Sequence, residues 1–243
     1  MNSYIENSEL PLVLIGGTLC NARLWQPLID SLNVSAVICL TLSCADSAPE
    51  ASRRLLKVLP PRFLLAGFSL GAIVALQMAA DAPERLAGLA LMSVNPLVDL
   101  PKNADVRRAG VQAAHERGHG TWVSDTLWKN YVAPTSFSNQ TLHDILCQMA
   151  EDTDSETFSR QTEIAISRRD NRDALSSLAC PVLILNGEHD PICTPDHHRL
   201  AAESAANATW LTLNSAGHFF VLESPDNTAA LLRQWMMESL KCE

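Results

Sequence analysis

The sequence contains no apolar run that approaches the roughly 20 residues of a membrane-spanning helix. The segment Met1–Glu6 has neither the basic start nor the apolar stretch of a secretory signal. Internal repeats and low-complexity tracts are also missing. We therefore expect a globular protein of the cytoplasm that has no membrane partner.

Signatures of metal or disulfide chemistry are missing as well. The seven cysteines are odd in number and form no C-x-x-C pair, which favours reduced thiols over disulfides or a zinc site. The seven histidines show no ligand spacing, and the adjacent His197 and His198 would diverge by about 100° on a helix. We expect neither a metal ion nor an organic cofactor.

Positive charge is scarce. The chain has 18 Lys and Arg against 27 Asp and Glu, for a net charge of −9. Such a balance argues against unspecific binding of nucleic acid. A length of 243 residues with 47% hydrophobic residues is enough to bury a large core.

The sequence does contain a regular alternation of short apolar runs and helical segments. We predict strands at residues 12–15, 36–40, 63–66, 86–92, 182–186 and 208–213, of which the first two have the continuous apolar run of a buried strand. Helices are predicted at 24–32, 49–59, 71–80, 195–205 and from 225 onward. This alternation predicts an α/β fold, with a mostly parallel sheet of about six strands and helices on both faces.

The pattern changes after Pro96. Residues 98–178 contain no convincing buried strand, but four segments have helical character: 105–117, 121–131, 141–149 and 155–167. We interpret residues 98–178 as a helical lid, inserted in a core that consists of residues 1–97 and 179–243.

The third strand runs into Gly67-Phe68-Ser69-Leu70-Gly71, a G-x-S-x-G pattern in a strand–turn–helix context. Small residues are needed two positions before and after the serine, because the chain doubles back there. Ser69 is therefore a candidate nucleophile. The same five residues could also be a plain tight connection in any α/β protein, so the later loops must decide.

A serine hydroxyl needs a general base and a group that orients that base. In a parallel sheet, loops at the carboxyl ends of the strands supply such groups. The loop after residues 182–186 contains Glu188, His189 and Asp190, and the loop after residues 208–213 contains His218.

We assign His218 as the base and Asp190 as the orienting carboxylate. Glu188 is the competing acid and His189 the competing base. Asp190 is favoured because Pro191 follows it in a sharply turning loop, and His218 because a base next to Asp190 in the chain could hardly point at it.

A tetrahedral intermediate also requires two N–H donors, the oxyanion hole. One is expected from Leu70, the residue after the nucleophile. For the other we predict Thr18, in the loop after the first strand, with Leu19 as the next candidate. The alternative for Gly16-Gly17 is a plain tight turn.

Taken together, these motifs resemble those of α/β-hydrolase fold serine hydrolases. Gly67–Gly71 matches the nucleophile elbow, Gly187-x-x-Asp190-x-x-x-x-Pro195 resembles the acid loop, and the segment from Ala216-Gly217-His218-Phe219 to Pro225 resembles the histidine loop. Residues 17–25 are similar to the oxyanion segment of carboxylesterases related to pimeloyl-[acyl-carrier protein] methyl ester esterase. In that family a helical lid is inserted after the sixth strand.

The chain departs from that family in two places. Gly16-Gly17 stands where the family usually has His-Gly, which makes this loop more flexible. The first strand also starts near residue 11, too early for the family's opening β-hairpin. We therefore expect about six core strands rather than eight.

The resemblance implies an esterase that acts through an acyl-enzyme on a small-molecule ester, free or bound to a carrier protein. The same three residues could instead cleave a thioester, a lactone or a carbon–carbon bond beside a carbonyl. A ligand-binding protein without catalysis is disfavoured, because such proteins often lose one of the three residues.

Several large side chains adjoin these positions in the sequence. Leu19, Trp25, Phe68 and Phe219 are predicted to line an acyl pocket, and Trp128 is predicted to contribute from the lid; each could instead be plain core. Leu127 and Tyr131 share one helical face, which we expect to form the roof of a hydrophobic channel.

Four arginines gather late in the predicted lid: Arg160, Arg168, Arg169 and Arg172. In an acidic chain they could bind an acidic carrier protein or a carboxylate. The alternative is a solvated helix surface.

Overall fold

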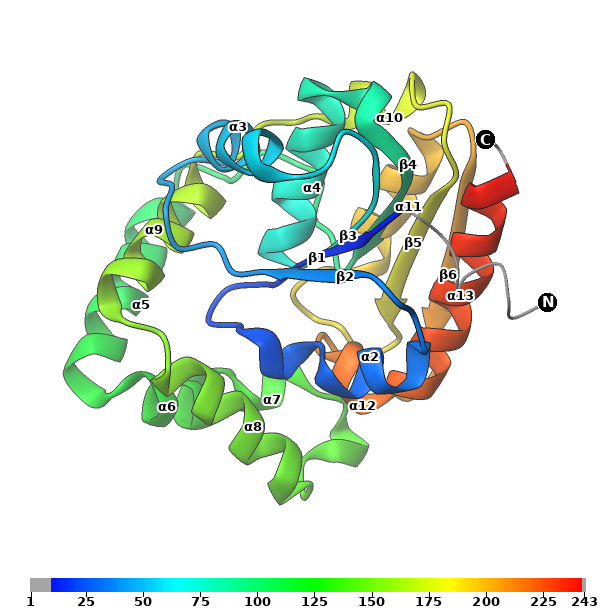
Figure 1. The fold of residues 1–243 in the computed structure, drawn as a ribbon. Helices are drawn as coiled ribbons and strands as arrows, with labels where there is room; N and C mark the ends of the chain where they lie inside the picture. Colours follow the sequence, from blue (N-terminus) through cyan, green and yellow to red (C-terminus); the bar gives the residue numbers. More distant parts are fainter. Residues whose placement is uncertain (1–9, 242–243) are drawn as a thin grey trace.

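The structure, a computed structural model, describes residues 10–241. Its sheet has six parallel strands in the described residues, in the order β2-β1-β3-β4-β5-β6 (Figure 1). The strands are β1 (Leu12–Ile15), β2 (Val37–Leu40), β3 (Phe63–Phe68), β4 (Leu86–Met92), β5 (Val182–Gly187) and β6 (Ala208–Leu213). The predicted parallel sheet is confirmed.

Each central strand is buried on both faces, because alternate side chains point to opposite sides. Leu12 and Leu14 of β1 pack in one apolar cluster, with residues of the helices α2 (Gln26–Leu32) and α13 (Pro225–Lys241). Val13 and Ile15 pack in the other, with α3 (Ala48–Val58), α4 (Leu70–Asp81) and α11 (Pro195–Glu203). Helices therefore cover both faces of the sheet, as predicted (Figure 1).

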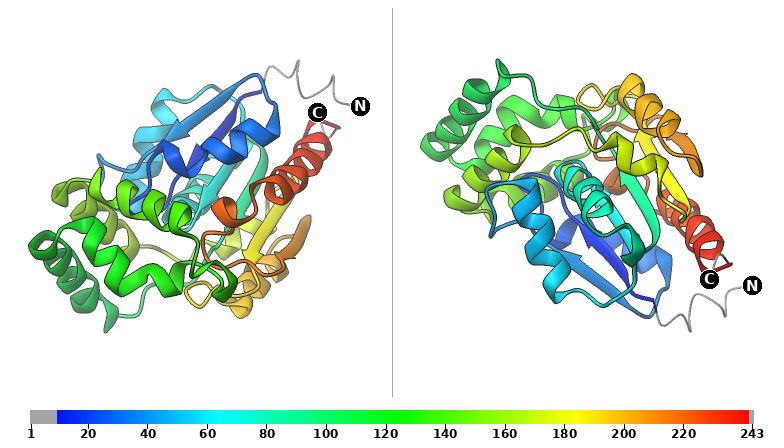
Figure 2. Two further views of the ribbon diagram at one scale, coloured as in Figure 1. Left: turned by 90° about the horizontal axis from the view of Figure 1, so that it is seen from below. Right: turned by 90° about the horizontal axis from the view of Figure 1, so that it is seen from above.

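The segment between β4 and β5 is helical and contains no strand in the part of the chain that is described. Its α-helices are α5 (Asn103–Arg117), α6 (His119–Trp122), α7 (Trp128–Tyr131), α8 (Gln140–Glu151), α9 (Ser155–Ile166) and α10 (Arg172–Ser176). Figure 2 shows α5 to α9 gathered at one end of the sheet. Side chains of these helices line a cavity together with loops that follow β1, β3, β5 and β6, so this end is the carboxyl end of the strands.

The predicted helix at 121–131 differs from the observed one. A π-helical turn, η3 (Val123–Leu127), joins α6 to α7. The sequence analysis also missed two short helices, α10 and α12 (Phe220–Glu223), and the last two residues of β3. Four- and five-residue helices span little more than one turn, which is too short to show helical periodicity.

Other features of the fold are its remaining short helices, its cysteines and the length of its helices. The remaining short helices are η1 (Ala22–Leu24), η2 (Pro83–Arg85) and η4 (Pro134–Ser136). Six cysteines lie in the described part of the chain, and no disulfide joins any two of them. Among residues 10–241, no helix is both long enough and apolar enough to cross a bilayer.

Candidate active site

Ser69 lies at the turn between β3 and α4, with φ of 52° and ψ of −111°. This left-handed backbone is strained for a residue with a Cβ, so its surroundings must hold it in place. A Cβ on Gly71 would collide with the carbonyl oxygen of Ile15, and one on Gly67 would collide with the backbone of Gly71. The Ser69 N–H donates to the Met92 carbonyl at 2.8 Å. The turn therefore needs both glycines.

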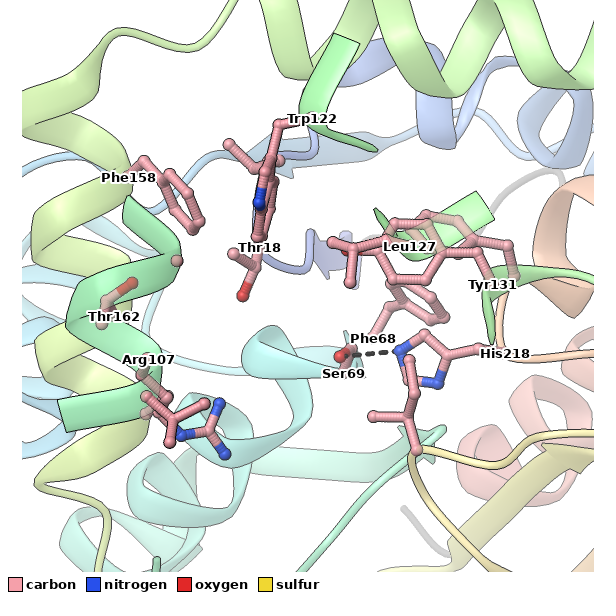
Figure 3. A pocket seen from close by; sticks show the side chains of 16 residues that line it. Thr18, Phe68, Ser69, Arg107, Trp122, Leu127, Tyr131, Phe158, Thr162 and His218 are labelled. Atoms are coloured by element: carbon pink, nitrogen blue, oxygen red, sulfur yellow. Dashed lines mark hydrogen bonds between the residues drawn. The ribbon is translucent and has the colours of Figure 1, made fainter. Parts of the chain in front are cut away.

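Ser69, His218 and Asp190 form a chain of hydrogen bonds. Ser69 Oγ lies 3.0 Å from His218 Nε2 (Figure 3). On the other side of the ring, His218 Nδ1 lies 2.8 Å from Asp190 Oδ2. A carboxylate can only accept, so His218 carries a hydrogen on Nδ1; in the neutral ring Nε2 is then free to accept the Ser69 proton. The structure thus brings together the three residues that the sequence analysis selected.

Asp190 is buried, and both of its carboxylate oxygens accept hydrogen bonds. Its Oδ1 accepts the N–H groups of Ile192 and Cys193, each at 2.9 Å, while Oδ2 pairs with His218. Burial by itself raises the pKa of this carboxyl, but the adjacent His218 and the backbone N–H groups outweigh it, so the pKa of Asp190 lies below its usual value. Asp190 is therefore ionised at neutral pH and can stabilise an imidazolium on His218.

Glu188 and His189 lie apart from this arrangement. Glu188 accepts the Ser215 N–H at 2.9 Å, and its carboxylate lies 3.8 Å from the half-exposed ring of His189. Neither residue lines the cavity beside Ser69.

The histidine loop is held by three contacts. Ser93 Oγ donates to the His218 carbonyl at 3.0 Å. The carboxylate of Glu223 accepts the Gly217 N–H at 2.6 Å and the Ala133 N–H at 2.8 Å. Glu223 therefore ties the loop that carries His218 to the segment between β4 and β5.

Two backbone N–H groups near Ser69 remain available. Neither Thr18 nor Leu70 donates its N–H to any acceptor in the described residues. The N–H of Leu19, the second candidate on this loop, is occupied by Gln161 Oε1 at 2.9 Å. Gly17 brings the loop close to Ser69, since a Cβ there would lie 3.2 Å from the Cβ of Ser69. The geometry therefore favours Thr18 over Leu19.

A cavity of about 320 Å³ opens beside Ser69 and His218 (Figure 3). Its wall is mostly apolar and aromatic and comes from the core as well as from the segment between β4 and β5. Of the predicted substrate-binding residues, Leu19, Phe68 and Phe219 line it. So do Leu127 and Tyr131, which the sequence analysis placed on one helical face. Additional lining comes from Trp122, Phe158 and Thr162.

Trp25 and Trp128 do not line this cavity, in contrast to the prediction. Trp25 lies behind Phe68, with the ring centroids 6.5 Å apart and the rings nearly perpendicular. Trp128 packs edge-on against His143 at 5.0 Å, within the helical segment. It follows Leu127 directly, so its side chain leaves the helix about 100° around from the face that reaches the cavity.

A profile described as the alpha/beta hydrolase family matches residues 12–231. The chain belongs to this family. The pimeloyl-[acyl-carrier protein] methyl ester esterase of Legionella pneumophila (strain Corby) is 24% identical over 245 residues, which cover 93% of this chain and 95% of that protein. The biotin biosynthesis bifunctional protein BioHC of Teredinibacter turnerae is 22% identical over 79% of this chain. The chain spans only 36% of that bifunctional protein.

Solved structures of other α/β hydrolases share the fold. A thermophilic esterase from Thermogutta terrifontis superposes with a TM-score of 0.84 at 21% identity, over 96% of this chain and 91% of that one. The enol-lactonase from Burkholderia xenovorans gives a TM-score of 0.82 at 18% identity, over 95% of this chain and 93% of that one. At these identities the likeness establishes the fold alone.

The four clustered arginines of this α/β hydrolase are mostly paired. Arg160 contacts Glu156 and Asp46, and Arg172 contacts Asp170. Arg168 is buried, and its Nη2 lies 3.2 Å from Asp99. Arg169 alone among the four is exposed without a partner in the described residues. The cluster therefore does not form the free positive surface that the sequence suggested.

One group in the described residues has the spacing of metal ligands. Side-chain donor atoms of Asp190, Cys193 and His218 lie within 4.8 Å of one another. Asp190 and His218 are already bonded to each other, and the remaining oxygen of Asp190 accepts two N–H groups. The hydrogen-bond chain to Ser69 therefore explains why these side chains lie so close together.

Two side chains of this α/β hydrolase that the sequence analysis missed are Gln161 on α9 and Arg107 on α5. Gln161 accepts the Leu19 N–H in the loop after β1, and Arg107 lines the cavity. Each is one of several polar residues on its helix and lies far along the chain from the residues that it approaches. Spacing within the sequence gives no signal for such contacts.

Proposed function

We propose that this α/β hydrolase cleaves a carboxylic ester through a covalent acyl-enzyme. The observation that supports this most strongly is the hydrogen-bond chain from Ser69 through His218 to the buried Asp190, beside an apolar cavity. It supplies a nucleophile, a general base within 3.0 Å of it, and a carboxylate that fixes the tautomer of that base.

In the first half-reaction, His218 Nε2 accepts the Ser69 proton while Ser69 Oγ attacks the ester carbonyl. The carbonyl oxygen becomes an oxyanion, for which the Thr18 and Leu70 N–H groups are the available donors. When the tetrahedral intermediate collapses, the C–O bond to the alcohol breaks and His218 protonates the leaving oxygen. Water then attacks the acyl-enzyme by the same route and releases the acid.

The same residues could cleave a thioester, a lactone or a carbon–carbon bond beside a carbonyl. An ester is favoured because the relative that covers 93% of this chain is named as a methyl ester esterase. A function in ligand binding alone is disfavoured, since His218 lies within hydrogen-bond distance of both Ser69 and Asp190.

The test compares esters, thioesters and lactones of matched acyl chain length. We expect kcat/KM to be highest for the esters, and Ser69→Ala to lower it by several orders of magnitude. Faster turnover of thioesters or lactones would replace the ester assignment. Undiminished turnover by Ser69→Ala would refute the assignment of Ser69 as the nucleophile.

We also propose that the acyl group can be presented on a carrier protein, because a curated relative is named for a carrier-bound substrate. The paired arginines offer little support for this. Arg169→Glu is the suitable probe, because Arg168 is buried and its reversal would disturb folding. Slower turnover of the carrier-bound ester, with the free ester unaffected, would support docking at this position.

A further inference from the structure

The cavity beside Ser69 contains one permanently charged side chain, that of Arg107. The other lining residues in the described part of the chain are apolar or uncharged, apart from the imidazole of His218. Arg107 comes from α5, and Figure 3 shows it on the other side of Ser69 from His218. A cation is thus placed in an apolar site of a chain whose net charge is −9.

Arg107 is held in place by a shared carboxylate. Asp99 accepts Nε and Nη2 of Arg107 at 2.8 and 3.0 Å. The same carboxylate lies 3.2 Å from Nη2 of the buried Arg168, and it also accepts Asn103 Nδ2 at 3.1 Å. Because two guanidinium groups share one carboxylate, this cluster retains a net positive charge.

Some N–H donors of the Arg107 guanidinium are not used by Asp99. Asp99 occupies the edge that carries Nε and one hydrogen of Nη2. No bond from Nη1 is made within the described residues. Nη1 and Nη2 together form the end of the fork that can hold a second carboxylate through two parallel hydrogen bonds.

A second, smaller cavity connects this cluster with the reaction centre. It measures about 90 Å³ and is lined by Ser69, Leu70, Asn95, Arg107 and Arg168, among others. Its wall therefore includes both arginines as well as the nucleophile and the residue after it.

We propose that Arg107, held by the Asp99 carboxylate that it shares with Arg168, binds a carboxylate of the substrate, so that the preferred ester is one that carries a second, anionic group, as in the half-ester of a dicarboxylic acid. This inference rests on the proposed ester hydrolysis. It assigns Arg107 to substrate selection, whereas Ser69, His218 and Asp190 carry out the chemistry.

The test uses two esters that differ in one group. The 4-nitrophenyl half-ester of adipic acid ends in a carboxylate, and the corresponding ester of adipamic acid ends in a neutral amide of nearly the same shape. We expect wild-type kcat/KM to favour the carboxylate by at least about tenfold, as charge-assisted hydrogen bonds predict. Arg107→Gln should remove that preference, and Arg107→Lys should retain part of it.

Arg108→Gln is the matched control, because Arg108 lies on the same helix, carries the same charge and does not line the cavity. It should leave the ratio of the two substrates unchanged. An equal loss on both esters in Arg107→Gln, or no preference in the wild type, would overturn the proposal.

A second readout separates this inference from the proposed function. Adipate should slow the labelling of Ser69 by a fluorophosphonate more than adipamide does, and Arg107→Gln should abolish the difference. If neither ester is hydrolysed but this protection persists, the carboxylate site stands and the ester function fails. If esters are hydrolysed while adipate gives no Arg107-dependent protection, the carboxylate site fails and the ester function stands.

Discussion

Gln161 is a single buried side chain that holds the loop after β1, in which the proposed oxyanion donor Thr18 lies. It is completely buried, and both ends of its amide are used: Oε1 accepts the Leu19 N–H at 2.9 Å, and Nε2 donates to the Leu42 carbonyl at 3.0 Å. Leu19 has a φ of 56°, a conformation that needs such support. Because Leu19 follows Thr18, the bond to Gln161 fixes the direction of the Thr18 N–H.

Gln161→Met should therefore lower kcat by roughly 10- to 100-fold, below the full effect of removing an oxyanion donor, while KM changes by less than about threefold. The physical reason is a loop that no longer presents the Thr18 N–H in a fixed direction. Steady-state kinetics on a 4-nitrophenyl ester measure both constants.

Gln148→Met serves as the control, since Gln148 is exposed on the neighbouring α8 and bonds only to Asp152 in the described residues. Affinity for a trifluoromethyl ketone, which forms an oxyanion on Ser69, should fall in parallel with kcat in Gln161→Met. A folded Gln161→Met variant with wild-type kcat and wild-type affinity for the ketone would show that Gln161 does not orient the Thr18 N–H.

At the scale of the elements, β1 and the turn between β3 and α4 touch through backbone atoms. A Cβ on Gly71 would collide with the Ile15 carbonyl, whereas a Cβ on Gly16 would meet the Cys20 Cβ at 3.4 Å as its nearest neighbour. Glycine is thus required at the first position and exchangeable at the second. The loop that departs from the family pattern at Gly16 has room for a side chain.

Gly71→Ala should lower Tm by about 3–10 °C, because overpacking of this kind costs about 1–3 kcal/mol. Gly16→Ala should shift Tm by less than about 2 °C. Calorimetry on the two variants makes the comparison, and equal losses of Tm would contradict the account of the turn.

The central strands could be predicted from the sequence because they are short runs of apolar residues buried on both sides, as in β1 and β4. The edge strand β2 was located correctly, but its residues are only partly buried, in contrast to the prediction, because it has a neighbouring strand on one side only. The segment between β4 and β5 was less readable. The π-helical turn at Val123–Leu127 leaves no mark in the apolar pattern, and the cavity-facing side of that helix could be assigned only to Leu127 and Tyr131.

At the scale of the whole molecule, His198 couples folding to pH. It is fully buried on α11, where Nδ1 donates to the Thr194 carbonyl at 2.9 Å and Nε2 accepts the Val94 N–H at 3.1 Å. Burial lowers the pKa of His198 to about 4, from about 6.5 in an exposed ring. Between these two values the unfolded chain binds a proton that the folded chain does not, so stability is lost as the pH falls.

His198→Gln can keep one donor and one acceptor but has no group that titrates. We expect the difference in unfolding free energy between wild type and variant to fall by up to about 3 kcal/mol between pH 7.5 and pH 4. Urea denaturation across that range measures the difference. Parallel pH profiles for the two proteins would rule out a buried, neutral His198.

The three residues of the hydrogen-bond chain could be selected from the sequence because each lies in a loop directly after a strand. Ser69, Asp190 and His218 follow β3, β5 and β6, and the carboxyl ends of parallel strands meet at one edge. Arg107 and Gln161 could not be found in this way. Their positions depend on how α5 and α9 dock on the sheet, which only the folded molecule determines.

The most direct test of the central claim is covalent labelling of the nucleophile. Wild-type protein is treated with a fluorophosphonate probe, digested, and the modified residue is located by mass spectrometry. We predict one adduct, on Ser69, that disappears in Ser69→Ala and forms at least about 100-fold more slowly in His218→Gln, because no base then removes the serine proton. An unlabelled Ser69 in folded protein, or labelling at an undiminished rate in His218→Gln, would contradict the account.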